Sequence, residues 1–237
     1  MRRLDQLLSS LGYCSRKEAQ VWCDEGRLTL DGVVLDDASR RVEPARVLLD
    51  GDPLEFPNGL LVMINKPVGV VCSHDSSEGK RVYDLVPERW LLRDPKVTTV
   101  GRLDKDTSGL LLLTDQGQLV QRLTSPRHHV EKVYVATLDR DVTPEMIEAF
   151  KHGVELIEGN ERVRTQPAVL KAVGAKQAEV TLSEGKYHQV RRMFAAVGAH
   201  VEALERTRLG EWTLGDLAPG KWLPLPSGEG RGEGMDP

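Results

Sequence analysis

The stretch VGRLDKDTSGLLLLTDQG, residues 100–117, places a charged segment between two runs that are typical of buried strands. These runs are VTTV at 97–100 and LLLL at 110–113. A hairpin usually needs only about two to five connecting residues, whereas nine residues, 101–109, lie between these runs. Asp104 lies in the middle, with a basic residue close on either side. The segment predicts either a functional carboxylate held between strands or a loop aspartate that bonds its own backbone.

The composition describes a globular chain. Of its 237 residues, 40% are hydrophobic and 29% are charged, and no run of about 18 apolar residues that could span a membrane occurs. The three cysteines have neither a pairing nor a metal-like spacing, which suits a reducing compartment. The N-terminal segment also lacks the apolar core of a secretory signal. We therefore expect a cytoplasmic protein with no membrane contact.

The net charge of −4 argues against a protein that binds nucleic acid by bulk charge alone, since such domains are usually basic. Local basic patches stay possible, because affinity depends on where lysine and arginine lie. Residues 1–57 hold eight basic and eleven acidic residues, whereas residues 184–208 hold five basic and three acidic residues. The charge around 184–208 is therefore locally positive.

The first 35 residues predict two helices and a hairpin. Four leucines from Leu4 to Leu11 follow the spacing of one helical face, and a glycine follows them. Ser15 and Glu18 have the spacing of a capping box, which predicts the start of a second helix. Asp31-Gly32 between two apolar runs predicts a hairpin, because a type I′ turn needs positive φ at both central residues.

The chain beyond a linker predicted at 54–59 contains interleaved strand and helix signals, which indicate an α+β fold. Thr143-Pro144 predicts the start of one helix, and we expect another over 188–197. The segment 227–234 has no apolar residue to bury, so we expect a disordered tail at 227–237. The expected strands are 60–64, 70–72, 97–100, 110–113, 133–138, 178–182 and 201–204.

Four ordered motifs carry a resemblance to a known family. They are Asn65-Lys66-Pro67-Val68-Gly69, then Gly101-Arg102-Leu103-Asp104 with Thr107-Ser108-Gly109-Leu110, then Lys132-Val133-Tyr134, and finally Glu184-Gly185-Lys186-Tyr187-His188-Gln189-Val190-Arg191-Arg192-Met193. On these motifs the chain resembles the pseudouridine synthases. The stretch from about Arg3 to Asp52 resembles the S4 RNA-binding domain, so the two resemblances together cover about residues 1–225.

This resemblance implies an α+β fold with two domains. A small S4-like domain at 1–57, an αα-hairpin followed by strands, would bind RNA. A pseudouridine synthase domain at 58–226 would contain a central, mainly antiparallel mixed sheet.

The resemblance also implies an active site that needs no metal and no organic cofactor. Asp104 matches the nucleophile of the family, and Tyr134 matches its active-site tyrosine. Arg191 matches the basic partner that would hold the Asp104 carboxylate ionised through a charge-assisted hydrogen bond, with Arg192 as the alternative. Taken without the resemblance, Tyr134 is equally a strand aromatic that fills the core, and Arg192 is a phosphate contact or plain helix surface.

We expect the other basic and polar candidates to contact RNA, although most lysines and arginines are solvated surface charges. His128 and His129 are expected on an extended segment, where neighbouring side chains point to opposite faces, so we do not expect them to chelate one metal ion. The candidate RNA contacts are Arg2, Arg3, Arg16, Lys17, Arg27, Lys66, Arg102, Arg127, His128, His129, Lys132, Lys186, His188, Gln189 and Arg192.

Arg127-His128-His129 and Tyr187-His188 resemble the family members that act on small-subunit (16S) ribosomal RNA, at the uridine conventionally numbered 516. This resemblance implies isomerisation of that uridine to pseudouridine by base flipping, carried out by a monomer on ribosomal RNA that is free or in an assembling particle. Two alternatives stay open: a synthase for large-subunit ribosomal RNA, and a non-catalytic S4-type RNA-binding factor for ribosome assembly. A dinucleotide-dependent dehydrogenase is disfavoured, since no G-x-G-x-x-G motif occurs.

Overall fold

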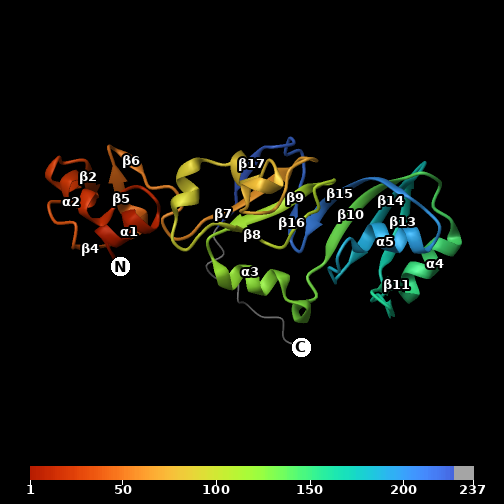
Figure 1. Cartoon of the computed structure of the whole chain (residues 1–237). Helices are drawn as coiled ribbons and strands as arrows, with labels where there is room; N and C mark the ends of the chain where they lie inside the picture. Colours follow the sequence, from red (N-terminus) through yellow and green to blue (C-terminus); the bar gives the residue numbers. More distant parts are fainter. Residues whose placement is uncertain (227–237) are drawn as a thin grey trace, which may run out of the picture.

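The computed structural model describes residues 1–226, so the tail predicted at 227–237 lies outside the described residues. Figure 1 shows an elongated molecule, with a small N-terminal unit at one end and a larger unit built on one long sheet. The α-helices are α1 (Leu4–Ser10), α2 (Arg16–Asp24), α3 (Gly117–Thr124), α4 (Pro144–His152) and α5 (Gln189–Ala196). Short 3-10 helices are η1 (Pro44–Arg46), η2 (Ser76–Glu78), η3 (Val82–Leu85), η4 (Glu88–Leu92) and η5 (Pro126–His128).

Within residues 1–226, the strands form one large sheet and three small ones. Strands of the small N-terminal unit are β1 (Arg2–Arg3), β2 (Leu28–Leu30), β3 (Val33–Val34), β4 (Arg41–Val42), β5 (Val47–Leu49) and β6 (Asp52–Pro53). Strands of the large unit are β7 (Leu61–Lys66), β8 (Thr98–Thr99), β9 (Thr107–Thr114), β10 (Lys132–Leu138), β11 (Glu155–Glu158), β12 (Glu161–Arg164), β13 (Val169–Gly174), β14 (Gln177–Leu182), β15 (Val201–Leu209), β16 (Trp212–Thr213) and β17 (Trp222–Pro224).

The small unit confirms the local predictions made from its sequence. Ser15 Oγ accepts a hydrogen bond from the Glu18 N–H at 3.3 Å, and the Glu18 carboxylate accepts one from the Ser15 N–H at 2.8 Å, so the capping box is complete. Asp31 and Gly32 have φ values of 51° and 80°, as the predicted turn requires. The leucines of α1 are buried in a core of their own with residues of α2, β2 and β5.

The large sheet has the order β13-β14-β10-β15-β9-β7-β17, with β8 paired to β9 and β16 paired to β15. Within residues 1–226, its one parallel pair is β15 with β9, so the predicted mainly antiparallel mixed sheet is confirmed. On one face, α4 and α5 pack against the half formed by β10, β13, β14 and β15. The segment with η3 and η4 packs on β7 and β9, and α3 covers these two strands from the opposite face.

Three expectations about secondary structure were wrong. Residues 70–72 form no strand, because Val71 makes only an isolated bridge to Arg81, although Val70 and Cys72 are buried. The strand expected at 97–100 is reduced to the two residues of β8. Strand β9 begins at Thr107, so the connection that carries Asp104 spans only 100–106 and is shorter than the nine residues expected.

The junction between the two units is built from polar and aromatic contacts. The Trp90 indole N–H donates to the Glu55 carboxylate at 2.8 Å, and the buried Arg93 donates to the Phe56 carbonyl at 2.8 Å. The Arg89 guanidinium lies 4.1 Å from the centre of the Tyr13 ring. The segment predicted as a linker is therefore fixed to the large unit. None of the helices within residues 1–226 has the length and hydrophobicity that crossing a bilayer requires.

Candidate active site

A row of residues crosses the middle of the sheet on the face that α5 covers. Lys66 of β7 pairs with Gly109 of β9, Gly109 pairs with Arg206 of β15, and Arg206 pairs with Tyr134 of β10. Residues directly opposite each other in a sheet share a face. Gly109 has φ 104°, and a Cβ there would lie 2.3 Å from the Arg206 carbonyl oxygen. Glycine at this position therefore allows β9 and β15 to pair closely at the centre of the row.

Asp104 lies in the connection that leads into β9, beside this row. The Thr107 N–H donates to the Asp104 carbonyl at 3.1 Å, and the Gly69 N–H donates to the Lys105 carbonyl at 2.7 Å, so both ends of the turn are fixed. The Asp104 side chain keeps 33% of its surface exposed, and its Oδ1 lies 3.3 Å from His188 Nε2. The carboxylate is therefore held in place and still reachable by a substrate.

Arg191 was expected to pair with Asp104, but it forms no ion pair with that carboxylate. Its Nη2 lies 3.0 Å from the Asp106 carboxylate and donates to the Asp106 carbonyl, while Nη1 donates to the Val201 carbonyl at 2.9 Å. Arg191 lies in the first turn of α5, and its guanidinium reaches Asp106 at the end of the connection and Val201 at the start of β15. Arg191 thus anchors the Asp104 connection, and His188 is the side chain that meets the carboxylate.

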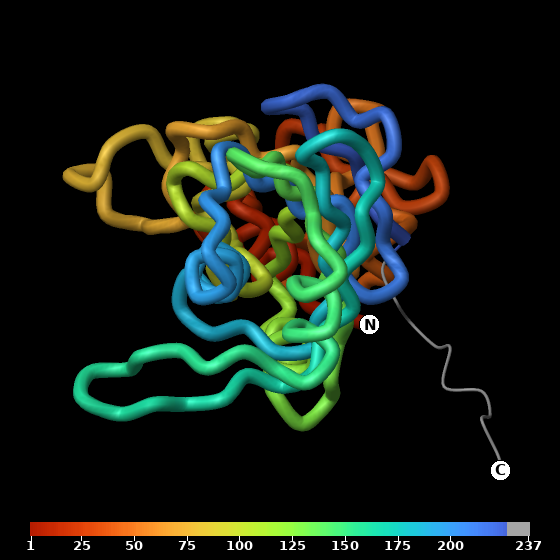
Figure 2. Tube along the Cα trace, turned by 90° about the vertical axis from the view of Figure 1, so that its right-hand side faces the viewer, coloured from red at the N-terminus to blue at the C-terminus, as the bar shows by residue number. Residues whose placement is uncertain are grey.

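Arg192 does not contact Asp104 either. Its guanidinium donates to the Tyr187 carbonyl at 3.1 Å and to the Ile157 carbonyl at 2.6 Å, and it lies 3.6 Å from the Glu158 carboxylate. Arg192 therefore ties α5 to the β11–β12 hairpin. Figure 2 shows this hairpin projecting from the body of the molecule on the same side as the connection that follows β7, with α5 between them in this view.

Tyr134 is partly buried and packs against both hydrophobic clusters of this face, one under α4 and α5 and the other under η3 and η4. The ring therefore lies where the two clusters meet, in the row that contains Lys66 and Arg206. This position is compatible with both interpretations of Tyr134, as a core aromatic and as an active-site tyrosine, because the ring contributes to the core and also lies in the row of the candidate site.

Several predicted RNA contacts are buried. Lys66 has no exposed surface, because its side chain lies on the packed face of the sheet. Burial lowers the pKa of its ammonium. Gln189 is 5% exposed and uses its amide to bond Glu184 and Lys186. The Lys132 ammonium donates to the Val130 carbonyl, and burial lowers its pKa too. Neither Lys66 nor Gln189 is available to contact RNA directly.

The candidates of the small unit are mostly engaged within the protein. Arg3 and Arg16 both donate to the buried Asp5 carboxylate, and Arg27 bonds Asp50. Other candidates form further internal contacts: Arg2 with Ser10, and Lys186 with Glu158. Exposed candidates whose side chains form neither an ion pair nor a hydrogen bond within residues 1–226 are Lys17, Arg102, Arg127, His128 and His129.

His128 and His129 do not lie on an extended segment, as was expected. His128 ends η5, and His129 is left-handed with φ 46°, because the segment turns after Pro126. Within residues 1–226, no group of three or more histidine, cysteine, aspartate or glutamate residues is arranged to hold a metal ion.

Arg206 is a residue of the site that sequence reasoning missed. It is 3% exposed, its Nε donates to the Leu110 carbonyl at 2.9 Å, and its Nη2 is buried without a hydrogen-bond partner. Within residues 1–226, neither Arg206 nor Lys66 has a carboxylate within ion-pair distance. The signal for Arg206 was its position two residues after the buried Leu204, which places both on one face of a strand.

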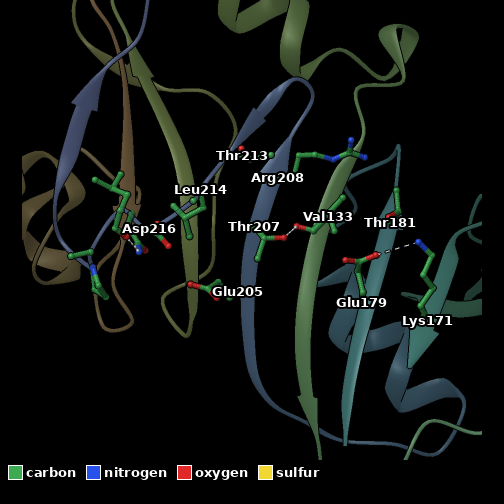
Figure 3. Close-up of a pocket in the computed structure, with 15 residues that line it drawn as sticks. Val133, Lys171, Glu179, Thr181, Glu205, Thr207, Arg208, Thr213, Leu214 and Asp216 are labelled. Carbon is green, nitrogen blue, oxygen red and sulfur yellow. Dashed lines mark hydrogen bonds and ion pairs between the residues drawn. The ribbon is translucent and has the colours of Figure 1, made fainter. Parts of the chain in front are cut away.

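A cavity of about 680 Å³ lies on the opposite face of the sheet. Figure 3 shows that its lining includes Glu205 and Thr207 of β15, Val133 of β10 and Glu179 of β14. These residues alternate with Arg206, Tyr134 and Val180 along the strands, so they point away from the Asp104 face. The cavity is therefore separate from the row of residues that lies beside Asp104.

Comparisons with known proteins follow the same division of the chain. The family described as RNA pseudouridylate synthase matches residues 60–196, and the S4 domain family matches residues 2–48. Ribosomal small subunit pseudouridine synthase A of Escherichia coli (strain K12) is 44% identical over 228 residues, covering 94% of this chain and 96% of that protein. An uncharacterized RNA pseudouridine synthase of Bacillus subtilis (strain 168) is 38% identical and covers 94% of both chains. A crystal structure of a pseudouridylate synthase has 33% identity and a TM-score of 0.64, covering 95% of this chain and 96% of that chain.

Proposed function

Because this chain belongs to the RNA pseudouridylate synthase family and carries an S4 domain at its N-terminus, we propose that it isomerises one uridine of small-subunit ribosomal RNA to pseudouridine. The target in this proposal is the uridine conventionally numbered 516. The observation that supports the proposal best is the Asp104 carboxylate, which is held by the backbone bonds of its connection, is partly exposed and lies 3.3 Å from His188 Nε2.

The reaction exchanges one glycosidic bond for another within the same nucleotide. The N1–C1′ bond breaks, the uracil turns and C5 bonds to C1′. The hydrogen that C5 carried leaves as a proton, and N1 takes up a proton, so the product is an isomer of the substrate. Asp104 acts as the nucleophile, with attack at C1′ and attack at C6 as the two first steps open to an ionised carboxylate. Either step regenerates the carboxylate when the new C5–C1′ bond is complete and the adduct collapses.

The target base must leave its stack before Asp104 can reach it, at a cost of a few kcal/mol. Tyr134, at the meeting point of the two clusters, packs against the flipped uracil, and its hydroxyl handles the C5 proton as a general acid or base. Arg191 holds the connection that carries Asp104 through its bonds to Asp106. In this proposal its role is to position the nucleophile.

The S4 domain supplies a second contact with the RNA, so the substrate is held at both units of one monomer. The exposed candidates Lys17, Arg102, Arg127, His128 and His129 fit phosphate contacts, whereas the buried Lys66 and Gln189 support the site from within. We place the domain boundary at the junction near 54–57, where Glu55 and Phe56 already bond to the large unit. Free ribosomal RNA and the assembling particle are the two forms of substrate on which the reaction rate is to be compared.

Release of tritium from RNA labelled at uracil C5 tests this function. Wild-type protein should release label from small-subunit RNA to a limit of one site per molecule, and the released position should map to uridine 516. Asp104→Asn should release none within detection, whereas Glu148→Gln should keep the wild-type rate, because it removes only exposed ion pairs on α4, each worth about 1 kcal/mol or less. Full retention of label by wild type would favour the non-catalytic RNA-binding alternative, and release from large-subunit RNA only would favour the other synthase.

A further inference from the structure

Two adjacent aromatic side chains lie stacked at the entrance to the candidate site. The rings of Tyr187 and His188 are 3.8 Å apart and inclined by 18°. One face of the Tyr187 ring is covered by the imidazole, yet the residue is 75% exposed, the highest value among the large hydrophobic residues that lie exposed within residues 1–226. An apolar ring this exposed, with one face already covered, leaves its other face open to solvent.

The backbone of this pair is unusual and well supported. His188 adopts a left-handed conformation with φ 48°, which is uncommon for a residue with a side chain. The Gln189 amide accepts the Lys186 N–H at 2.8 Å, and Arg192 donates to the Tyr187 carbonyl at 3.1 Å. Residues predicted as RNA contacts therefore support the turn that presents Tyr187 and His188. The surrounding structure holds a conformation that costs free energy, and such strain is concentrated at functional sites.

The inner member of the pair meets the nucleophile. His188 Nε2 lies 3.3 Å from Asp104 Oδ1. Within residues 1–226 no other basic side chain lies within ion-pair distance of this carboxylate, because Arg191 is engaged by Asp106 and Arg192 by Glu158. The exposed Tyr187 ring is thus connected to Asp104 through His188, whose ring stacks on Tyr187 and whose Nε2 meets the carboxylate.

We propose, on the basis of the proposed function, that Tyr187 and His188 form a base-binding platform that positions the nucleophile. The free face of Tyr187 stacks on a base of the substrate strand next to the target uridine. Such stacking is worth about 1 to 3 kcal/mol per base and tolerates any sequence, because every base has a π face. His188 is a positioning residue that holds the Asp104 carboxylate in the orientation for attack.

The two roles predict different kinetic effects, which steady-state tritium release from small-subunit RNA can separate. Tyr187→Ala should raise KM on the order of tenfold with kcat little changed, and Tyr187→Phe should restore the wild-type KM, because it keeps the stacking surface. His188→Ala should lower kcat on the order of tenfold or more at unchanged KM. His188→Gln should recover part of that loss, since its amide can donate to Asp104.

His152→Ala is the matched control, because His152 forms an exposed contact of the same kind with Glu148, at 2.7 Å, on α4. It should leave both constants unchanged. Thermal unfolding of each variant reports whether a change in kcat or KM results from a turn that fails to fold. If His188→Ala does not fold, the comparison of His188→Gln with wild type decides the positioning role.

The platform is refuted if Tyr187→Phe is as impaired as Tyr187→Ala, or if the two His188 variants keep the wild-type kcat. Either result leaves the proposed function standing, provided that wild type releases tritium and Asp104→Asn does not. If wild type releases none, the function fails, and the affinity of each full-length Tyr187 variant for an RNA oligonucleotide that spans the target tests the platform separately. Equal affinity of Tyr187→Ala and Tyr187→Phe would then overturn the stacking role.

Discussion

Replacing Gly109 by alanine tests the closeness of the β9–β15 pair. The added Cβ would lie 2.3 Å from the Arg206 carbonyl oxygen and 2.7 Å from the Arg206 nitrogen, both of them backbone atoms that cannot turn aside. Overpacking of this kind costs about 1 to 3 kcal/mol, and φ 104° adds about 1 to 3 kcal/mol for a residue with a side chain. We expect Gly109→Ala to lose about 2 to 6 kcal/mol of unfolding free energy, which follows from adding these two costs.

Urea unfolding followed by tryptophan fluorescence and far-ultraviolet circular dichroism measures this loss. Gly117→Ala is the matched control, because Gly117 begins α3 and a Cβ there meets no heavy atom within 4 Å. It should be neutral or slightly stabilising, since alanine favours helix. A loss below about 1 kcal/mol for Gly109→Ala would contradict the argument, because it would mean that the two strands separate at little cost.

Three further predictions concern the site, the junction and the small unit. Tyr134→Phe should change the thermal stability little and lower the rate of tritium release by about 100-fold or more; a fully active variant would restrict Tyr134 to packing. A chain lacking residues 1–57 should be less stable than one lacking 1–53 by about 2 to 5 kcal/mol, because it loses the Glu55 and Phe56 partners of Trp90 and the buried Arg93; equal urea midpoints would show that these contacts contribute nothing. Hydrogen bonds from Arg3 and then Arg16 lower the pKa of Asp5 to about 2, so this carboxylate stabilises the small unit above the unfolded pKa of about 4 and ceases to do so as the pH falls towards 2. Urea unfolding between pH 2 and 6 should therefore show a flatter pH dependence for Asp5→Asn than for wild type.

Local signals predicted the small unit well. The leucine spacing of α1, the capping box at Ser15 and the Asp31-Gly32 turn depend on neighbours within a few residues, so the sequence contains their full physical cause. Residues 70–72 were assigned to a strand for a different reason. A short apolar run is typical of a strand, but a strand also needs a partner for its backbone, and Val71 makes only one isolated bridge.

The contacts around Asp104 could not be predicted from the motifs. The resemblance implied Arg191 as the partner of Asp104, whereas Arg191 bonds Asp106 and the side chain that meets the Asp104 carboxylate is His188. That contact depends on the left-handed backbone at position 188, for which histidine gives no local signal. Lys66 and Arg206 meet across Gly109 only because strands distant in sequence pair there, so their burial could not be deduced from charge.

The position of β15 determines when the site can exist during synthesis. This strand, residues 201–209, lies between β10 and β9 and is the link that joins the two halves of the large sheet. In chain order it nevertheless follows every other strand of the large sheet except β16 and β17. A nascent chain that ends before residue 201 has the Asp104 connection and Tyr134 but lacks Arg206 and the parallel ladder to β9. The large sheet therefore cannot be completed until residues 201–209 have been synthesised and β15 pairs with strands on both sides.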